Sequence, residues 1–411
     1  MKRLWLGLVA LACSTGAAAA VPDARVLAAA AAARTQQLAL LERIVNIDSG
    51  TGDAAGAASV QAMLAERLRA LGASIEIVPA EVAGLGDNLV ARVAGKGKGR
   101  ILVIGHVDTV FAKGTVAERP FRIEGDRAFG PGVSDEKAGV VEAVTALELL
   151  RQLGATNYHS ITLLIETSEE TGSPGTRKLI DRLVRDADVE LNVEPGDAPD
   201  AITVWRKGSA TIHLAVHGRA AHAGVAPQDG RNAATELIHQ LATLDRFPKS
   251  GEGLTVNLTT LKAGDRVNVI PDLASADINY RVRNPAQFAE VRQAFEAAAK
   301  TTLVPETTVE VSVTPSFPPL ENNRATDALA ARAKAIYGGL GRTLAFAGNG
   351  GASESALAAA AGVPALDGLG PIGGGFHSAR EFLDLTTVTP RLYLLTKLLI
   401  DLGANPPVRQ E

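Results

Sequence analysis

Three short runs rich in apolar residues lie in the first half of the chain, and each leads into residues with polar side chains. They lie at residues 101–104, 161–167 and 189–193, separated by longer stretches with helical spacing such as residues 138–153. A continuous apolar run of four to eight residues is typical of a strand that is covered on both faces. The pattern therefore predicts an α/β fold in which helices enclose a sheet.

Each of these predicted strands is followed by side chains that can bind a metal. His106 follows the first run, Glu169 and Glu170 follow the second, Glu194 follows the third, and Asp135 lies in a glycine-rich loop between the first two. Taken singly, a structural histidine, a helix-capping aspartate and solvated loop acids are the commoner interpretations. The ends of neighbouring strands meet at one edge of an open sheet, so these side chains should lie close together. Because buried carboxylates need a cation, such a group of side chains predicts a metal site.

Two further residues fit this prediction. Asp108 lies two positions after His106, so on an extended backbone the two side chains point the same way and one can support the other. His377 lies in a second glycine-rich loop, residues 373–378, and is the natural fifth ligand.

The pattern changes at about Trp205. Alternating polar and apolar residues predict strands at 209–216, 254–261, 274–283 and 307–313, with helices at 233–244 and 286–300. This β-α-β-β-α-β order predicts an α+β, ferredoxin-like domain, residues 205–314, inserted between the two parts of the main domain, residues 21–204 and 315–411. His213 and His217 lie four apart on one face of a predicted strand, so we interpret them as structural.

Composition and charge narrow the class of protein. With 411 residues the chain is long enough for two well-buried domains. The net charge of -4 provides no basic stripe for a phosphate backbone, so nucleic acid is excluded as a partner.

The N-terminus has the order of a secretory signal peptide, residues 1–20. Lys2 and Arg3 are followed by the apolar residues 4–12 and by the small residues 17–20. The apolar run is too short for a stable membrane span, so we expect a periplasmic or secreted protein. A buried N-terminal helix and lipidation of Cys13 are the alternatives. Cys13 is the only cysteine, so a metal in the mature chain must be bound by His and carboxylate ligands.

Six short motifs follow one another along the chain: Gly105-His106-Val107-Asp108, Gly132-Val133-Ser134-Asp135, Glu169-Glu170, Val193-Glu194-Pro195, Ala221-His222-Ala223-Gly224 and Phe376-His377-Ser378. In this order they closely resemble the M20 family of dinuclear zinc metallopeptidases, and within it the glutamate carboxypeptidase branch. The resemblance covers nearly the whole mature chain and implies a main domain with a mixed sheet between helices and an inserted domain that serves as lid and dimerisation domain.

The resemblance implies two Zn²⁺ ions that share one carboxylate ligand. His106, Asp135 and Glu194 would bind one ion, and Asp135, Glu170 and His377 the other. A water between the metals would be the nucleophile. Glu169 would be the general base, and Asp108 would orient His106. The family also implies a cis peptide bond between Asp135 and Glu136.

Three residues of the inserted domain match substrate-binding positions of the family. His222 would donate to the oxyanion, Asn268 would contact the substrate, and Arg281 would bind a substrate carboxylate, for which its planar fork is suited. The resemblance also implies a homodimer. Relatives often have aspartate at the positions of Asn279 and Glu354, which affects the expected substrate geometry and not the reaction class.

We therefore predict a zinc-dependent hydrolase that releases a C-terminal amino acid, with glutamate the expected residue, from peptide, N-acyl or folate-like substrates. An N-acyl-amino-acid deacylase or dipeptidase of the same family is the first alternative. A non-catalytic periplasmic binding protein is the alternative from another class. Arg206 and Lys207 add positive charge near the domain junction, although we expect them to be solvated surface residues.

Overall fold

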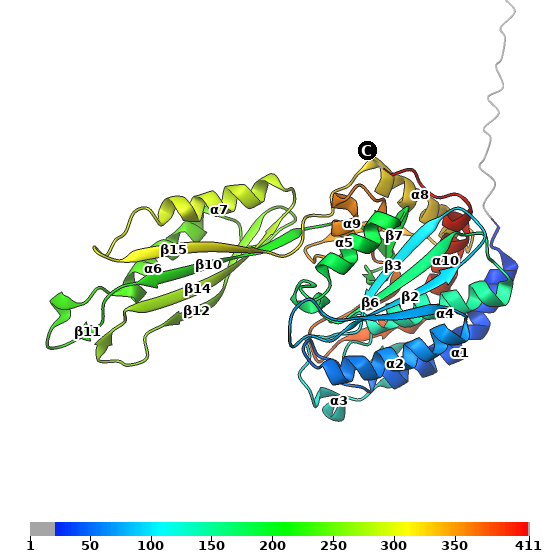
Figure 1. Ribbon diagram of the computed structural model, residues 1–411, viewed down its shortest axis with the longest axis horizontal. Coiled ribbons are helices and arrows are strands. Elements are labelled where there is room, and N and C mark those ends of the chain that lie inside the picture. Colours follow the sequence, from blue (N-terminus) through cyan, green and yellow to red (C-terminus); the bar gives the residue numbers. More distant parts are fainter. Residues whose placement is uncertain (1–20, 410–411) are drawn as a thin grey trace, which may run out of the picture.

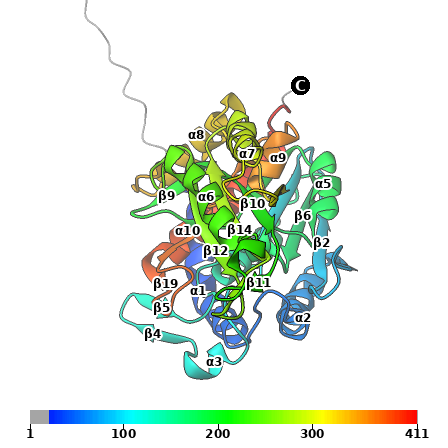
Figure 2. The ribbon, with the colours of Figure 1, turned by 90° about the vertical axis from the view of Figure 1, so that its left-hand side faces the viewer.

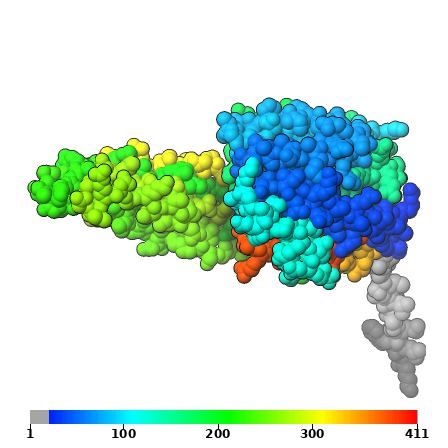
Figure 3. Space-filling view, turned by 90° about the horizontal axis from the view of Figure 1, so that it is seen from below, coloured from blue at the N-terminus to red at the C-terminus, as the bar shows by residue number. Residues whose placement is uncertain are grey.

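The computed structural model describes residues 21–409, which form a broad main domain and a narrower inserted domain that projects from it (Figures 1 and 3). The predicted signal peptide and Cys13 lie outside the described residues. No helix within residues 21–409 is long and apolar enough to cross a membrane.

A six-stranded mixed sheet is the centre of the main domain. Strands β3, β6, β7 and β17 are parallel, whereas β1 and β2 are antiparallel to their neighbours. Ile101 to Ile104 are all buried, so the sheet is covered on both faces, as the continuous apolar runs predict. In spatial order the strands are β1 (Ser74–Val78), β2 (Asn88–Ala94), β6 (Ser160–Glu166), β3 (Arg100–His106), β7 (Val189–Asn192) and β17 (Ala365–Leu366).

Helices cover both faces of this sheet (Figure 1). Four helices, α1 (Ala24–Val45), α2 (Ala54–Ala70), α4 (Lys137–Leu153) and α10 (Leu385–Ala404), pack on one face. Helices α5 (Arg177–Asp186) and α9 (Ser355–Ala360) pack on the other, and α8 (Arg324–Gly338) contacts α10 and β17. The predicted α/β fold is confirmed.

A second sheet of the main domain combines distant parts of the chain. Its order is β4 (Arg122–Glu124), β5 (Arg127–Phe129), β19 (Phe382–Asp384), β18 (Gly370–Gly374) and β8 (Pro195–Gly196), and a separate pair joins β9 (Ala201–Arg206) to β16 (Ala345–Asn349). Strand β18 was not predicted, because its glycines carry no alternating side chains. They allow close packing: a Cβ at Gly373 would lie 1.9 Å from the Ser134 Oγ.

The inserted domain has the predicted α+β order. Its antiparallel sheet runs β12 (Thr255–Ala263), β14 (Leu273–Val282), β10 (Gly208–His217) and β15 (Thr308–Pro315), with α6 (Ala233–Leu241) and α7 (Ala286–Ala298) packed on one face. A short ribbon of β11 (Ala221–His222) and β13 (Val269–Ile270) forms its far tip in Figure 1. Figure 2 views the molecule from that tip, with the inserted domain in front of the main domain. The short helical turns are α3 (Thr115–Glu118), η1 (Glu169–Thr171), η2 (Pro227–Asp229) and η3 (Ala242–Arg246).

Candidate metal centre and active site

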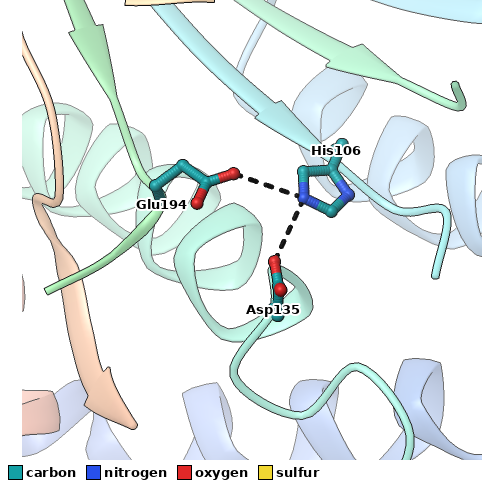
Figure 4. Close-up of side chains that lie close together, drawn as sticks. All are labelled: His106, Asp135 and Glu194. Atoms are coloured by element: carbon teal, nitrogen blue, oxygen red, sulfur yellow. Dashed lines mark ion pairs between the residues drawn. The ribbon is translucent and has the colours of Figure 1, made fainter. Parts of the chain in front are cut away.

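Three side chains from three separate segments converge at the carboxyl edge of the central sheet (Figure 4). His106 ends β3, Glu194 follows β7, and Asp135 lies just before α4. The Nε2 atom of His106 lies 3.3 Å from Asp135 Oδ1 and 3.5 Å from Glu194 Oε1. One ligand atom of each residue lies within 4.8 Å of the others, so the group could hold a metal ion.

A second group of the same kind lies beside the first and shares Asp135 with it. The Nε2 atom of His377 lies 3.1 Å from Asp135 Oδ2 and 3.2 Å from Glu170 Oε2. Asp135 thus directs Oδ1 to one histidine and Oδ2 to the other. The structure brings together all five side chains that were predicted to bind metal.

His106 is held in a fixed orientation by Asp108. The Nδ1 atom of the imidazole lies 3.0 Å from the backbone oxygen of Asp108 and 3.5 Å from its carboxylate. The opposite atom, Nε2, is buried and has no hydrogen-bond partner among the described residues. A buried nitrogen in that position, surrounded by carboxylates, is chemically suited to a divalent cation.

Asp108 also fixes the turn that carries the adjacent glutamates. Its Oδ1 accepts a hydrogen bond of 3.2 Å from the backbone N–H of Glu169, and its Oδ2 accepts one of 3.3 Å from that of Glu170. The Oδ2 atom also accepts a bond of 2.7 Å from the Thr51 hydroxyl. One buried carboxylate therefore positions side chains that follow two neighbouring strands.

The loop that carries Asp135 is held by Glu381, which sequence reasoning missed. This buried carboxylate accepts hydrogen bonds of 2.9, 2.9 and 3.0 Å from the backbone N–H groups of Gly132, Ser134 and Asp135. The predicted cis peptide bond between Asp135 and Glu136 is present. Asp135 does not cap α4, because no side chain makes a capping bond at that end.

The electrostatics of the site are suited to a bound cation. Hydrogen bonds to Asp135 and Glu170 raise the pKa of His377 to about 10. Burial raises the pKa of Glu194 to about 7, even though Arg206 opposes that change. Burial also raises the pKa of Glu169 well above its usual value, and the Glu354 carboxylate adds to this effect. The two histidines and Arg206 offset part of the negative charge of these acids, and a divalent cation would offset more of it.

Arg206 is not a solvated surface residue, so that expectation is wrong, and Lys207 is likewise buried. The guanidinium of Arg206 donates to both oxygens of Asp367, at 2.6 and 2.8 Å, and lies 3.3 Å from Glu194 Oε2. Asp367 lies 161 residues further along the chain, so the sequence pattern gave no sign of this buried pair.

A cavity of about 1010 Å³ lies over both metal-binding groups, between the two domains. Arg281 lines it, as expected of a substrate contact. His222 and Asn268 do not; both are exposed in or beside the ribbon at the far tip of the inserted domain. The other lining residues include Glu169 and Arg177 from the main domain, Ser209, Thr211 and Asn279 from the inserted domain, and Ser316 and Phe317 from the connecting segment.

Together the fold and the two metal-binding groups define a metallopeptidase, and the chain belongs to peptidase family M20/M25/M40, whose model matches residues 102–401. It is 36% identical over 370 residues to carboxypeptidase G2 of Pseudomonas sp. (strain RS-16), covering 89% of each chain. It is 30% identical over 346 residues to succinyl-diaminopimelate desuccinylase of Methylorubrum extorquens, covering 77% of this chain and 86% of the relative.

The fold is also found in solved structures. An M20 family metallo-carboxypeptidase from Sulfolobus solfataricus superposes with a TM-score of 0.71 at 17% sequence identity, covering 90% of this chain and 99% of that one. The resemblance inferred from the six motifs is confirmed. Membership of a peptidase family also removes the alternative of a non-catalytic binding protein.

Proposed function

We propose that this protein is a dinuclear zinc carboxypeptidase that hydrolyses the amide bond before a C-terminal amino acid, glutamate in particular, in peptide, N-acyl or folate-like substrates. The observation that carries this proposal is the position of Glu169. It lines the cavity with its Oε2 atom 4.0 Å from His106 Nε2, yet it belongs to neither metal-binding group.

Glu169 acts as the general base. Its pKa is raised well above the usual value, first by burial and then by the charge of Glu354. A carboxylate in such surroundings takes a proton from water and passes it to the leaving amine more readily than a solvated one. Asp108 accepts a hydrogen bond from the backbone N–H of Glu169 and so keeps the Glu169 carboxylate in place for both proton transfers.

Two zinc ions held by the two groups would supply Lewis acidity, polarising the scissile carbonyl and lowering the pKa of the attacking water. The remaining tasks belong to side chains. Asp108 orients His106, and Arg281 binds the carboxylate that marks the end of the substrate.

The experiment is a hydrolysis panel of N-acyl amino acids that differ only at the C-terminal residue, run with the zinc-loaded protein and after treatment with a chelator. We expect two metal ions per chain and release of the amino acid that stops when the chelator is added. The kcat/KM should be highest for the substrate that ends in glutamate. Release of no C-terminal residue by the zinc-loaded protein would overturn it.

An N-acyl-amino-acid deacylase that recognises the acyl group is the second candidate. The 30% identity to a succinyl-diaminopimelate desuccinylase favours it. The two candidates differ in the side of the amide bond that sets specificity. A second panel, with the amino acid constant and the acyl group varied, separates them by the larger spread in kcat/KM.

We also propose a homodimer formed through the inserted domain. The edge strand β12 carries the exposed side chains of Leu258 and Leu261, and Val225 and Val267 are exposed near the tip. In such a dimer, His222 and Asn268 serve the cavity of the partner, with His222 as oxyanion donor and Asn268 as substrate contact. A monomer in sedimentation at working concentration contradicts this arrangement.

Export to the periplasm or medium, directed by residues 1–20, is part of the same proposal. Fractionation of cells that express the full chain tests it. Activity and the processed chain should both appear outside the cytoplasm, and variants with Lys2 and Arg3 replaced by Glu should remain inside.

A further inference from the structure

The cavity is lined by three arginines, and only one of them forms an ion pair with a carboxylate of the described residues. Arg206 binds Asp367 and Glu194, as described above. Arg177 and Arg281 make no ion pair with a carboxylate anywhere in residues 21–409. Burial lowers the pKa of both guanidinium groups, so a bound anion would compensate a real electrostatic cost.

Arg177 is held in place by uncharged groups. Its Nε and Nη2 atoms both donate to the backbone oxygen of Gly172, at 3.0 and 2.5 Å. The guanidinium lies over the ring of Phe317, with 4.2 Å between its Cζ atom and the ring centre. An arginine has five N–H donors, so three remain for a ligand in the cavity.

Arg281 is also held by uncharged groups. Its Nε donates to Asn279 Oδ1 at 3.0 Å, and its Nη1 lies 3.5 Å from the backbone oxygen of Gly350. Because the Asn279 amide is uncharged, Arg281 attracts a carboxylate more strongly than it would with an acid at that position.

Arg177 and Arg281 lie at opposite ends of a row of three neighbouring backbone segments at the domain junction. Arg177 packs against Phe317 at one end, and Arg281 itself forms the other end. The N–H of Ser209 donates to the oxygen of Phe317 at 2.8 Å, and Ser209 is the cross-strand partner of Arg281. Two strand spacings give about 10 Å between the backbones of Phe317 and Arg281. The two carboxylates of a glutamate are about 5 Å apart, a separation that two long arginine side chains can match from either end of such a row.

We propose that Arg177 is a second carboxylate-binding residue, so that the cavity selects a C-terminal residue with an acidic side chain: Arg281 binds the α-carboxylate and Arg177 the side-chain carboxylate. This inference rests on the proposed carboxypeptidase function. It assigns the choice between an acidic and a neutral C-terminal residue to one side chain of the main domain.

The test compares two substrates with the same acyl group, N-acyl-glutamate and N-acyl-glutamine, which differ only in the charge of the side chain. Zinc-loaded Arg177→Gln should lose about 10- to 100-fold in kcat/KM for the glutamate substrate, mainly through KM, because a charge-assisted hydrogen bond is lost. Its kcat/KM for the glutamine substrate should stay within about threefold of the unaltered protein. Arg177→Lys should restore part of the preference.

The matched control is Arg182→Gln, on the same helix, whose side chain is exposed and pairs with Glu76 at 3.6 Å. It should leave both substrates unchanged. An equal loss for both substrates in Arg177→Gln, or no loss for either, overturns the role of Arg177 while the carboxypeptidase function stands. If the unaltered protein releases no C-terminal amino acid at all, it is the proposed function that fails.

Discussion

Arg206 lies 3.3 Å from Glu194 while it holds Asp367 through two shorter hydrogen bonds. A candidate metal ligand is thus tied to a buried ion pair at the point where the chain leaves the main domain. The Oε2 atom of Glu194 faces this guanidinium, which leaves Oε1 directed at His106.

Removal of this guanidinium should destabilise the protein strongly. In Arg206→Met the fully buried carboxylate of Asp367 loses its charged partner, which we expect to lower the free energy of unfolding by about 3–5 kcal/mol. Denaturant unfolding of the metal-free protein measures this. The double variant Arg206→Met/Asp367→Leu removes both charges and should recover much of the loss. A cost below about 1 kcal/mol for the single variant would contradict the prediction.

Glu169→Ala should abolish turnover and retain the metal. Glu169 belongs to neither metal-binding group, and loss of a general base slows such reactions by about 10²- to 10⁴-fold. Metal analysis and steady-state kinetics on the same sample decide the outcome. Glu170→Ala is the control, since it should lose metal and activity together. An active Glu169→Ala protein would contradict the proposed role of Glu169 as general base.

Glu381→Gln should weaken metal binding although Glu381 is not a ligand. The amide places an NH₂ group against one of three backbone N–H donors, so the loop that presents Asp135 must shift. We expect a loss of about 10- to 100-fold in metal affinity, measured by competition with a chelating dye. The exposed Glu118→Gln should have no effect, and an unchanged affinity in Glu381→Gln would refute the supporting role.

Metal binding should release protons and strengthen as the pH rises. In the metal-free protein the pKa of His377 is about 10, raised by Asp135 and Glu170, so this ligand is protonated at pH 7. Because a protonated nitrogen cannot bind metal, affinity should increase between pH 6 and 8. Calorimetry in buffers of different ionisation enthalpy counts the protons, and an affinity independent of pH would contradict the prediction.

The stability of the metal-free protein should depend on pH in the opposite direction, because His377 contributes less to it as the pH rises. A histidine whose pKa is raised by folding stabilises the fold fully below its unfolded value of 6.5, and this contribution is lost as the pH rises towards 10. The thermal midpoint of the metal-free protein should therefore gain less from His377 at high pH. His377→Gln should remove this dependence, which would show as a flatter profile of midpoint against pH.

The central sheet and the convergence of the five candidate ligands could be predicted from the sequence because both depend on local patterns. Runs rich in apolar residues marked β3, β6 and β7, and parallel strands bring the residues that follow them to one edge of the sheet. The cavity-lining position of Arg281 was likewise expected from the resemblance.

What could not be predicted depends on contacts between distant positions. Glu381 holds a loop 246 residues away, and the burial of Arg206 depends on Asp367. Neither segment has a pattern that distinguishes a buried carboxylate from a solvated one. Strand β9 was also missed, since its apolar residues run directly into the change of pattern at Trp205.

The two passages of the chain between the domains lie side by side, joined by backbone hydrogen bonds between Arg206 and Leu320 and between Ser209 and Phe317. A two-stranded connection of this kind can twist while its hydrogen bonds remain intact. Arg177 lies in the main domain and Arg281 in the inserted domain, so a twist of this connection changes the distance between the two guanidinium groups. The length of the bound molecule would then set the angle between the domains.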